Sequence, residues 1–190
     1  MGLDMYLRTN SKTISKKVNE VEEDAPSYQA GWSEYLAKSG TACVWRKANQ
    51  IHKWFVDHVQ DGKDDCGCYD VEVEQLQQLL GIVNKVLDST TLVNGKVVNG
   101  YTFDYKMNVT PNIVDGMVLK DDSVAKKLLP TQEGFFFGSC DYDEYYWDDL
   151  KYTKERLEQI LGMLEKSEYN WWCVKGEDDW YVTFQYHSSW

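Results

Sequence analysis

The sequence lacks the features that are typical of duplex-DNA-binding proteins, membrane proteins and enzymes with a phosphate-binding loop. Its 20 Lys and Arg residues face 31 Asp and Glu residues, and the formal net charge of −11 excludes the broad basic face that binding to duplex DNA requires. No apolar run is long enough to span a bilayer, and no segment resembles a signal peptide. Walker-type and dinucleotide-type phosphate loops are missing, as is a Gly-x-Ser-x-Gly motif. We therefore expect no duplex nucleic acid and no membrane among its partners.

Cysteine is present but does not form the pattern of a secreted scaffold. The five cysteines are an odd number and occur without an export signal, so we expect a reduced, cytoplasmic protein whose folding needs no disulfide. Cys66 and Cys68 could contribute zinc ligands, yet no second Cys or His pair follows at the spacing of a zinc finger. We expect no bound metal and no cofactor.

Hydrophobic periodicity predicts strands near both ends of the chain and helices between them. Residues 2–9, 171–174 and 180–187 have the short alternating pattern of strands. Residues 44–60 are predicted to form the clearest helix. A second helix, which Asp70 can cap and which runs to about Leu87, is expected to pack antiparallel against it. A third helix is expected to begin near Tyr145, with Asp141 or Asp143 as its cap, and to end near Lys166.

Residues 88–122 have the character of an inserted β-hairpin. Asn94-Gly95 and Asn99-Gly100 are turn signals flanked by apolar and aromatic residues. A helical turn at 123–129 should end at Pro130, and residues 10–40 are expected to be a loop with one helical turn at 32–37. Together these patterns predict an α+β fold in a single domain over residues 1–190, with a mostly antiparallel sheet and about three helices on one face.

The stretch from Leu128 to Leu150 concentrates seven aromatic side chains and many carboxylates without one Lys or Arg. Phe135-Phe136-Phe137, between Gly134 and Gly138, is predicted to be a buried strand that leads into the third helix. The expected core residues are Trp45, Ala48, Phe55, Val59, Leu76, Leu80, Val83, Phe136, Leu157 and Leu161.

The segment around Arg46 supplies cations, an amide and aromatic rings that could face this stretch. Such a pocket suits a nucleotide-sized ligand, with rings on aromatic faces and an anionic group on Arg46. The predicted ligand-binding residues are Trp45, Arg46, Asn49, His52, Thr131, Gln132, Gly134, Tyr145 and Tyr146. His52 falls in an apolar stripe, where a core histidine is the more frequent role, and pairs such as Asp148-Asp149 are more often solvated helix starts. We assign no catalytic residue.

Several motifs resemble a family of small bacteriophage- and prophage-encoded proteins of uncharacterised function. The residues that carry the resemblance are Gly2–Leu7, Trp45–Asn49, Ile51-His52, Trp54–Val56, Asp64–Gly67, Leu128–Gln132, Gly134–Ser139, Asp143–Tyr146 and Ser188–Trp190. Residues 10–43 and 88–122 lie outside the pattern. The resemblance implies action in the cytoplasm of an infected bacterial cell and favours a role against host defence.

Three functions remain open on these grounds. The leading hypothesis is a phage-encoded protein that binds a small anionic or nucleotide-like molecule and sequesters a host nucleotide immune signal. The second is an acidic inhibitor of a host defence enzyme that handles nucleic acid, because carboxylates can occupy a site made for phosphates. The third is a small enzyme acting on a nucleotide metabolite through Asp64, Asp65 or His52. Self-association stays open as well.

Overall fold

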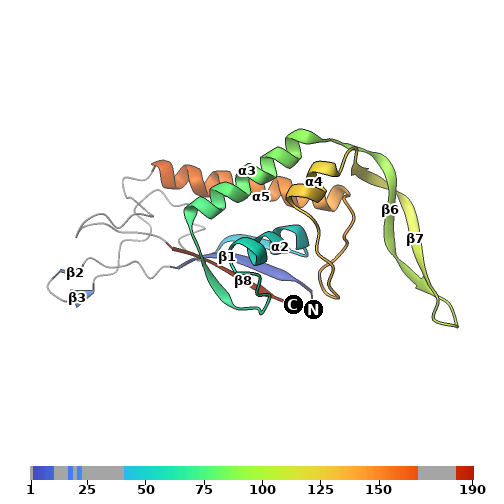
Figure 1. Ribbon diagram of the computed structural model, residues 1–190, viewed down its shortest axis with the longest axis horizontal. Helices are drawn as coiled ribbons and strands as arrows, with labels where there is room; N and C mark the ends of the chain where they lie inside the picture. Colours follow the sequence, from blue (N-terminus) through green and yellow to red (C-terminus); the bar gives the residue numbers. More distant parts are fainter. Residues whose placement is uncertain (1, 11–16, 19–20, 23–40, 167–182) are drawn as a thin grey trace.

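A four-stranded antiparallel sheet forms the base of the structure (Figure 1). The computed structural model describes residues 2–10, 17–18, 21–22, 41–166 and 183–190. The strands lie in the order β4 (Thr41–Arg46), β1 (Asp4–Asn10), β8 (Thr183–Ser189) and β5 (Cys68–Val71). Two short strands, β2 (Lys17–Val18) and β3 (Val21–Glu22), pair with each other. Pairing of β1 with β8 brings the two ends of the chain together.

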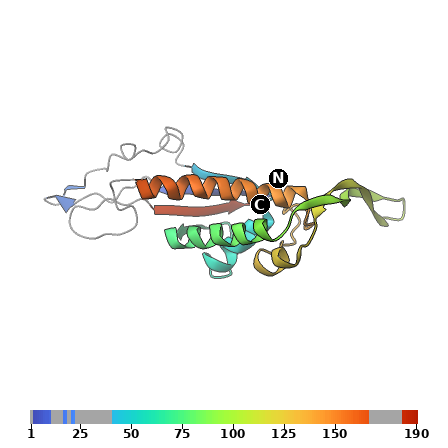
Figure 2. The same ribbon diagram turned by 90° about the horizontal axis from the view of Figure 1, so that it is seen from above.

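The helices cover one face of this sheet (Figures 1 and 2). They are α2 (Asn49–His58), α3 (Val73–Ser89), the short α4 (Ser123–Leu128) and α5 (Glu144–Lys166). Along β1, Met5 and Leu7 are fully buried while Tyr6 between them is only partly buried, as the alternation of a strand requires. Helices α3 and α5 pack against each other above this buried face. The predicted α+β fold, the strand at 2–9 and the helix ending at Lys166 are confirmed.

The predicted helix over 44–60 begins five residues too early. Residues up to Arg46 belong to β4, in which Cys43 and Trp45 point inward and Val44 is 41% exposed. Lys47 then turns the chain with a φ of 60°, and α2 starts only at Asn49. The spacing of the apolar residues suggested one continuous helix because the inner face of β4 and the apolar stripe of α2 enter the same core. Trp45 therefore continues the helical spacing of α2 although it belongs to β4.

Two details of the following helix also differ from the prediction. Glu72, and not Asp70, caps α3, because its side chain and that of Gln75 form a reciprocal capping box. Residues 68–71 form the unpredicted strand β5, whose Asp70 pairs across the sheet with Gln185. The expected antiparallel pairing of the first two helices is therefore wrong: β5 lies between them in the chain, and α3 packs on α5.

The predicted β-hairpin is confirmed as an arm that extends away from the body (Figures 1 and 2). It consists of β6 (Leu92–Phe103) and β7 (Val109–Leu119). The reversal occurs at 104–108, where the Asp104 carboxylate accepts hydrogen bonds from the backbone N–H groups of Lys106 and Asn108. Neither Asn-Gly pair forms the turn, since Gly95 pairs with Gly116 inside the ladder and Gly100 lies in a bulge with a φ of 82°.

The predicted buried strand at Phe135–Phe137 is wrong. These residues lie in a loop whose turn is closed by a hydrogen bond from the Phe137 N–H to the Gly134 carbonyl. Phe135 is 95% exposed, Phe136 is partly buried and Phe137 is 6% exposed. A three-residue apolar run cannot distinguish a core strand from a loop that places one ring in the core.

Most of the expected core residues are buried. Trp45, Ala48, Phe55, Leu76, Val83, Leu157 and Leu161 are buried, whereas Val59, Leu80 and Phe136 are only partly buried against the core. The predicted strand at 171–174, the start of the one at 180–187 and the helical turn at 32–37 lie outside the described residues. No helix in the described ranges has the length and apolarity needed to cross a bilayer.

Phe135 and Phe137 provide a matched test of this arrangement. Phe137→Ala should lower the free energy of unfolding by about 3 to 5 kcal/mol, because it removes a buried ring from the core. Phe135→Ala should change it by less than about 0.5 kcal/mol, since that ring is solvated. Urea denaturation of both variants measures the difference. Equal losses for the two would contradict the position of the loop.

Candidate functional site

A cavity of about 410 Å³ lies between the end of β4, the start of α2, the loop at 131–141 and the first turns of α5. Its lining residues are Arg46, Lys47, Gln50, Thr131, Gly138, Ser139, Asp141, Asp143, Tyr145, Tyr146, Asp148 and Asp149. The volume falls in the range of small-molecule sites in proteins. Most of these residues are polar or charged, yet carbon atoms provide most of the accessible lining, so a ligand with both polar groups and a ring suits the cavity.

One wall of the cavity carries two cations. Arg46 ends β4, and Lys47 follows in the turn with its positive φ. A guanidinium nitrogen of Arg46 lies 3.6 Å from an Asp4 carboxylate oxygen, with 68% of the arginine side chain exposed. An ion pair as exposed as this contributes little to stability, so Arg46 remains free to meet an anionic group.

The part of the lining that comes from the start of α5 carries carboxylates. Asp143 caps the helix, because its Oδ1 accepts hydrogen bonds from the N–H groups of Tyr145 at 3.0 Å and Tyr146 at 3.1 Å. Burial raises the pKa of Asp143 against the opposing effect of these bonds. The predicted choice between Asp141 and Asp143 as helix cap is thus resolved in favour of Asp143.

Asp149 is the most perturbed of these carboxylates. Burial raises its pKa to about 6, and the nearby Asp143 and Asp148 charges act in the same direction. The buried Gln50 side chain donates a hydrogen bond of 3.1 Å to Asp149 Oδ2, which partly offsets that rise. Thr153, one turn further along α5, connects this part of the helix to β4. Its hydroxyl donates to the Asp149 carbonyl at 2.7 Å and accepts from the Trp45 indole N–H at 2.8 Å.

The loop beside the cavity is fastened by one buried amide. Asn49 Nδ2 donates to the carbonyls of Phe137 at 3.1 Å and Ser139 at 2.7 Å, while its Oδ1 accepts from the Gln132 N–H at 3.0 Å. Gly138, with a φ of 92°, follows the buried Phe137 ring. A Cβ on Gly138 would lie 3.0 Å from the Lys47 Cβ. Glycine is therefore needed both for the positive φ and for the close approach to Lys47.

The structure brings only some of the predicted ligand-binding residues to the cavity. Arg46, Thr131, Tyr145 and Tyr146 line it. Tyr145 is 72% exposed, whereas Tyr146 is buried and its hydroxyl donates to the Leu129 carbonyl. Thr131 Oγ1 donates to the Cys140 carbonyl. Whether these residues bind a ligand stays a prediction.

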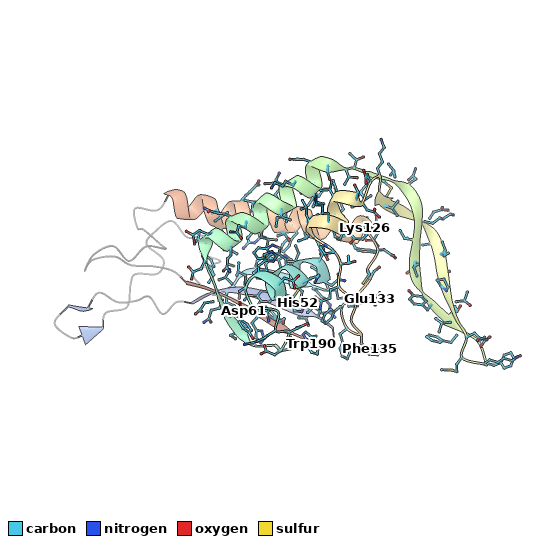
Figure 3. The ribbon with its side chains drawn as sticks, viewed as in Figure 1. His52, Asp61, Lys126, Glu133, Phe135 and Trp190 are labelled. Carbon is cyan, nitrogen blue, oxygen red and sulfur yellow. The ribbon has the colours of Figure 1, made fainter. Side chains whose placement is uncertain are left out.

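The other predicted residues serve the fold around the cavity. Trp45 is buried against α5, and Asn49 and Gln132 are joined in the loop anchor. His52 is fully buried inside the body (Figure 3), where its Nδ1 lies 2.7 Å from the Tyr186 hydroxyl and its Nε2 lies 3.1 Å from Asp64. Burial lowers the pKa of His52 more than Asp64 raises it. None of these four residues lines the cavity; they pack inside the fold around it.

Gly134 belongs to a second cavity next to the first. This cavity, of about 610 Å³, lies between the loop and the base of the arm, and includes Val98 and Tyr101. Both cavities share Lys47, Gly138, Ser139 and Asp141, so they adjoin along one side of the molecule. Figure 3 shows Glu133 and Phe135 on the loop between the body and the arm.

Sequence reasoning missed the importance of Gln50 and Asp149. A signal for Asp149 was available, because it lies three residues after Tyr146 and four before Thr153, both of which are buried. It therefore falls on the inner side of α5, unlike the exposed Asp148. The carboxylates of this region do not form one exposed row, since Asp143 is only 5% exposed.

Two further findings concern metal binding and similarity to known proteins. No group of three or more His, Cys, Asp or Glu in the described ranges is arranged to hold a metal ion. Comparison with known proteins finds no matching family model and no significant match to a curated protein or a solved structure. The chemistry of the cavity must therefore be judged from its own residues.

Asp149 gives a pH-dependent prediction. Its pKa rises from about 4 in an unfolded chain to about 6, so the folded state binds the proton more tightly. The stability that this group contributes is fully present below about pH 4 and is lost as the pH rises through 6. Asp149→Asn should therefore stabilise the protein by about 1 to 3 kcal/mol at pH 7, with a smaller gain towards pH 4.

Chemical denaturation of wild type and Asp149→Asn across this pH range measures the difference. Asp57→Asn serves as a control, because Asp57 is an exposed residue paired with Lys53 on α2. A gain for Asp149→Asn that does not change with pH would show that Asp149 is not held as a strained carboxylate.

Proposed function

We propose that this protein binds a small polar molecule that carries one anionic group and a ring with hydrogen-bond donors, as a nucleotide does. The observation that carries the proposal is that one cavity is lined both by the cations Arg46 and Lys47 and by the carboxylates Asp143 and Asp149. A guanidinium group binds phosphate or carboxylate through two parallel hydrogen bonds. Carboxylates accept paired N–H donors, such as those on the edge of an amino-substituted base.

The balance of charge narrows the ligand class further. Four aspartates and two cations line the cavity, so a ligand with several phosphates would meet net repulsion. A single phosphate or a cyclic phosphodiester is better matched. Tyr145, which is 72% exposed at the mouth of the cavity, provides an aromatic face for the ring of such a ligand.

In the infected cell, we propose, the molecule that this protein captures is a host signalling nucleotide. The resemblance to phage-encoded proteins supports action in the cytoplasm of an infected bacterium, where binding a nucleotide immune signal would block a defence pathway. Sequestration needs a cavity and no turnover, and nothing in the arrangement of Arg46, Gln50 and Asp149 requires a reaction. The protein then acts in proportion to its abundance and its affinity.

Calorimetric titration with 5′-guanylate, cyclic guanylate and cyclic adenylate tests the proposal, and ADP-ribose, which carries two phosphates, should bind more weakly than these three. Arg46→Ala should weaken binding of the best nucleotide by about 1.5 to 3 kcal/mol, the value of a charge-assisted hydrogen bond. Its melting temperature should barely change, because the ion pair that Arg46 makes with Asp4 is exposed. Lys53→Ala is the matched control, since Lys53 pairs with Asp57 on α2 and does not line the cavity.

The carboxylate wall is tested in the same titrations. Asp149→Asn should weaken nucleotide binding even though it stabilises the fold, so the two effects have opposite signs. Guanosine and inorganic phosphate, as the two halves of a ligand, should each bind more weakly than the nucleotide. No binding by any of the three nucleotides with one phosphate, or equal binding by wild type and both cavity variants, would overturn the proposal.

A further inference from the structure

The outer half of the arm has one apolar face that the described part of the body does not cover. In the ladder, residues directly opposite each other share a face. Three successive pairs, Val98 with Ile113, Tyr101 with Pro111 and Phe103 with Val109, fall on the same face of the ribbon. The exposed fractions are 61% for Tyr101, 64% for Phe103, 56% for Val109 and 59% for Ile113.

A β-bulge is what keeps these residues together. Val98 and Tyr101 are three positions apart, so in a regular strand they would point to opposite faces. The register shifts between them, and the extra residue is accommodated at Asn99 and Gly100, where Gly100 has a φ of 82°. The other face of this half carries the exposed polar residues Thr102, Thr110 and Asn112. The arm is thus amphipathic because of a specific irregularity in its backbone.

Such a ribbon needs a further partner to be stable. A two-stranded hairpin is marginal in water on its own, and within the described ranges only the half of this one nearer the body lies against it. Large exposed apolar patches on soluble proteins mark interaction sites. Seven of the twelve large hydrophobic residues that are exposed in the described chain lie on the arm, so this patch is a concentrated feature.

We propose that the occupant of this face is the same face of a second copy of the chain, related by a two-fold axis. The charge distribution supports this choice. The arm carries two Lys and two Asp between residues 92 and 119 and is neutral, whereas the whole chain has a net charge of −11. Two arms can therefore meet without a net charge repulsion between them.

The size of the patch is also sufficient. With about 150 to 250 Å² for each aromatic side chain, two such faces together bury on the order of 1,000 Å². That area reaches the lower limit of specific protein interfaces, and a two-fold contact uses one self-complementary patch twice. Val98 and Tyr101 also line the second cavity, so the partner's arm would cover that cavity from solvent. Self-association through the arm does not depend on the ligand proposed above.

Sedimentation velocity of the full chain tests this dimer. At about 50 μM, above the micromolar Kd of a weak interface of this size, wild type should sediment at twice the monomer mass. Phe103→Lys on β6 and Ile113→Lys on β7 should each shift the protein to the monomer. Thr102→Lys and Thr110→Lys add the same charge on the opposite face and should leave the dimer intact.

Hydrogen exchange on the wild type gives a measurement that does not depend on a variant folding. Amides in 97–103 and 109–114 should become more protected as the protein concentration rises through the dimer dissociation constant. A wild-type monomer at every concentration overturns the inference, as does a dimer that survives both Phe103→Lys and Ile113→Lys. Loss of the dimer in Thr102→Lys and Thr110→Lys as well would also overturn it, because the apolar face would then have no special role.

Discussion

The Asn49 side chain is the interaction on which the rest of the site depends. As the first residue of α2, it is buried and makes three hydrogen bonds to the backbone of a loop more than 80 residues away. Without it, two carbonyls and one N–H of that loop would lose their partners in a poorly solvated place, which costs about 1 to 3 kcal/mol for each group. The amide thereby holds Thr131 and Ser139 against the cations at the end of β4.

The carboxylates Asp143 and Asp149 near this Asn49 anchor lower the stability of the folded protein when they are charged. Burial raises the pKa of both Asp143 and Asp149, and nearby carboxylates raise it further: Asp141 acts on Asp143, and Asp143 and Asp148 act on Asp149. Gln50 stabilises the charged form of Asp149 without neutralising it. Groups that lower stability in this way are concentrated at functional sites, because a fold selected for stability alone would replace them. The cations that line the same cavity supply the other half of a site for a ligand of mixed character.

The fold was more predictable than the site, for physical reasons that particular residues make clear. The alternation of Leu3, Met5 and Leu7 and the inward stripe of α5 depend on local periodicity, which a sequence displays directly. Arg46 and Tyr145, both of which lie near the ends of predicted elements, line the same cavity, and their role in binding a ligand stays a prediction. The role of Asn49 was not accessible, because its partners are backbone groups of a loop whose path only the tertiary structure defines. The inward position of Asp149 could have been read from its spacing to Tyr146 and Thr153, but its partner Gln50 comes from a different helix and only the tertiary structure shows that contact.

The most direct measurement of the central claim is mass spectrometry of small molecules retained from a bacterial extract. Wild type and the Arg46→Ala variant are incubated with the same extract, freed of unbound solutes and denatured. The cavity predicts that wild type releases a molecule with one phosphate or carboxylate and an amino-substituted ring, and that the variant releases much less. Retention of nothing by wild type, or equal retention by both proteins, would contradict the account.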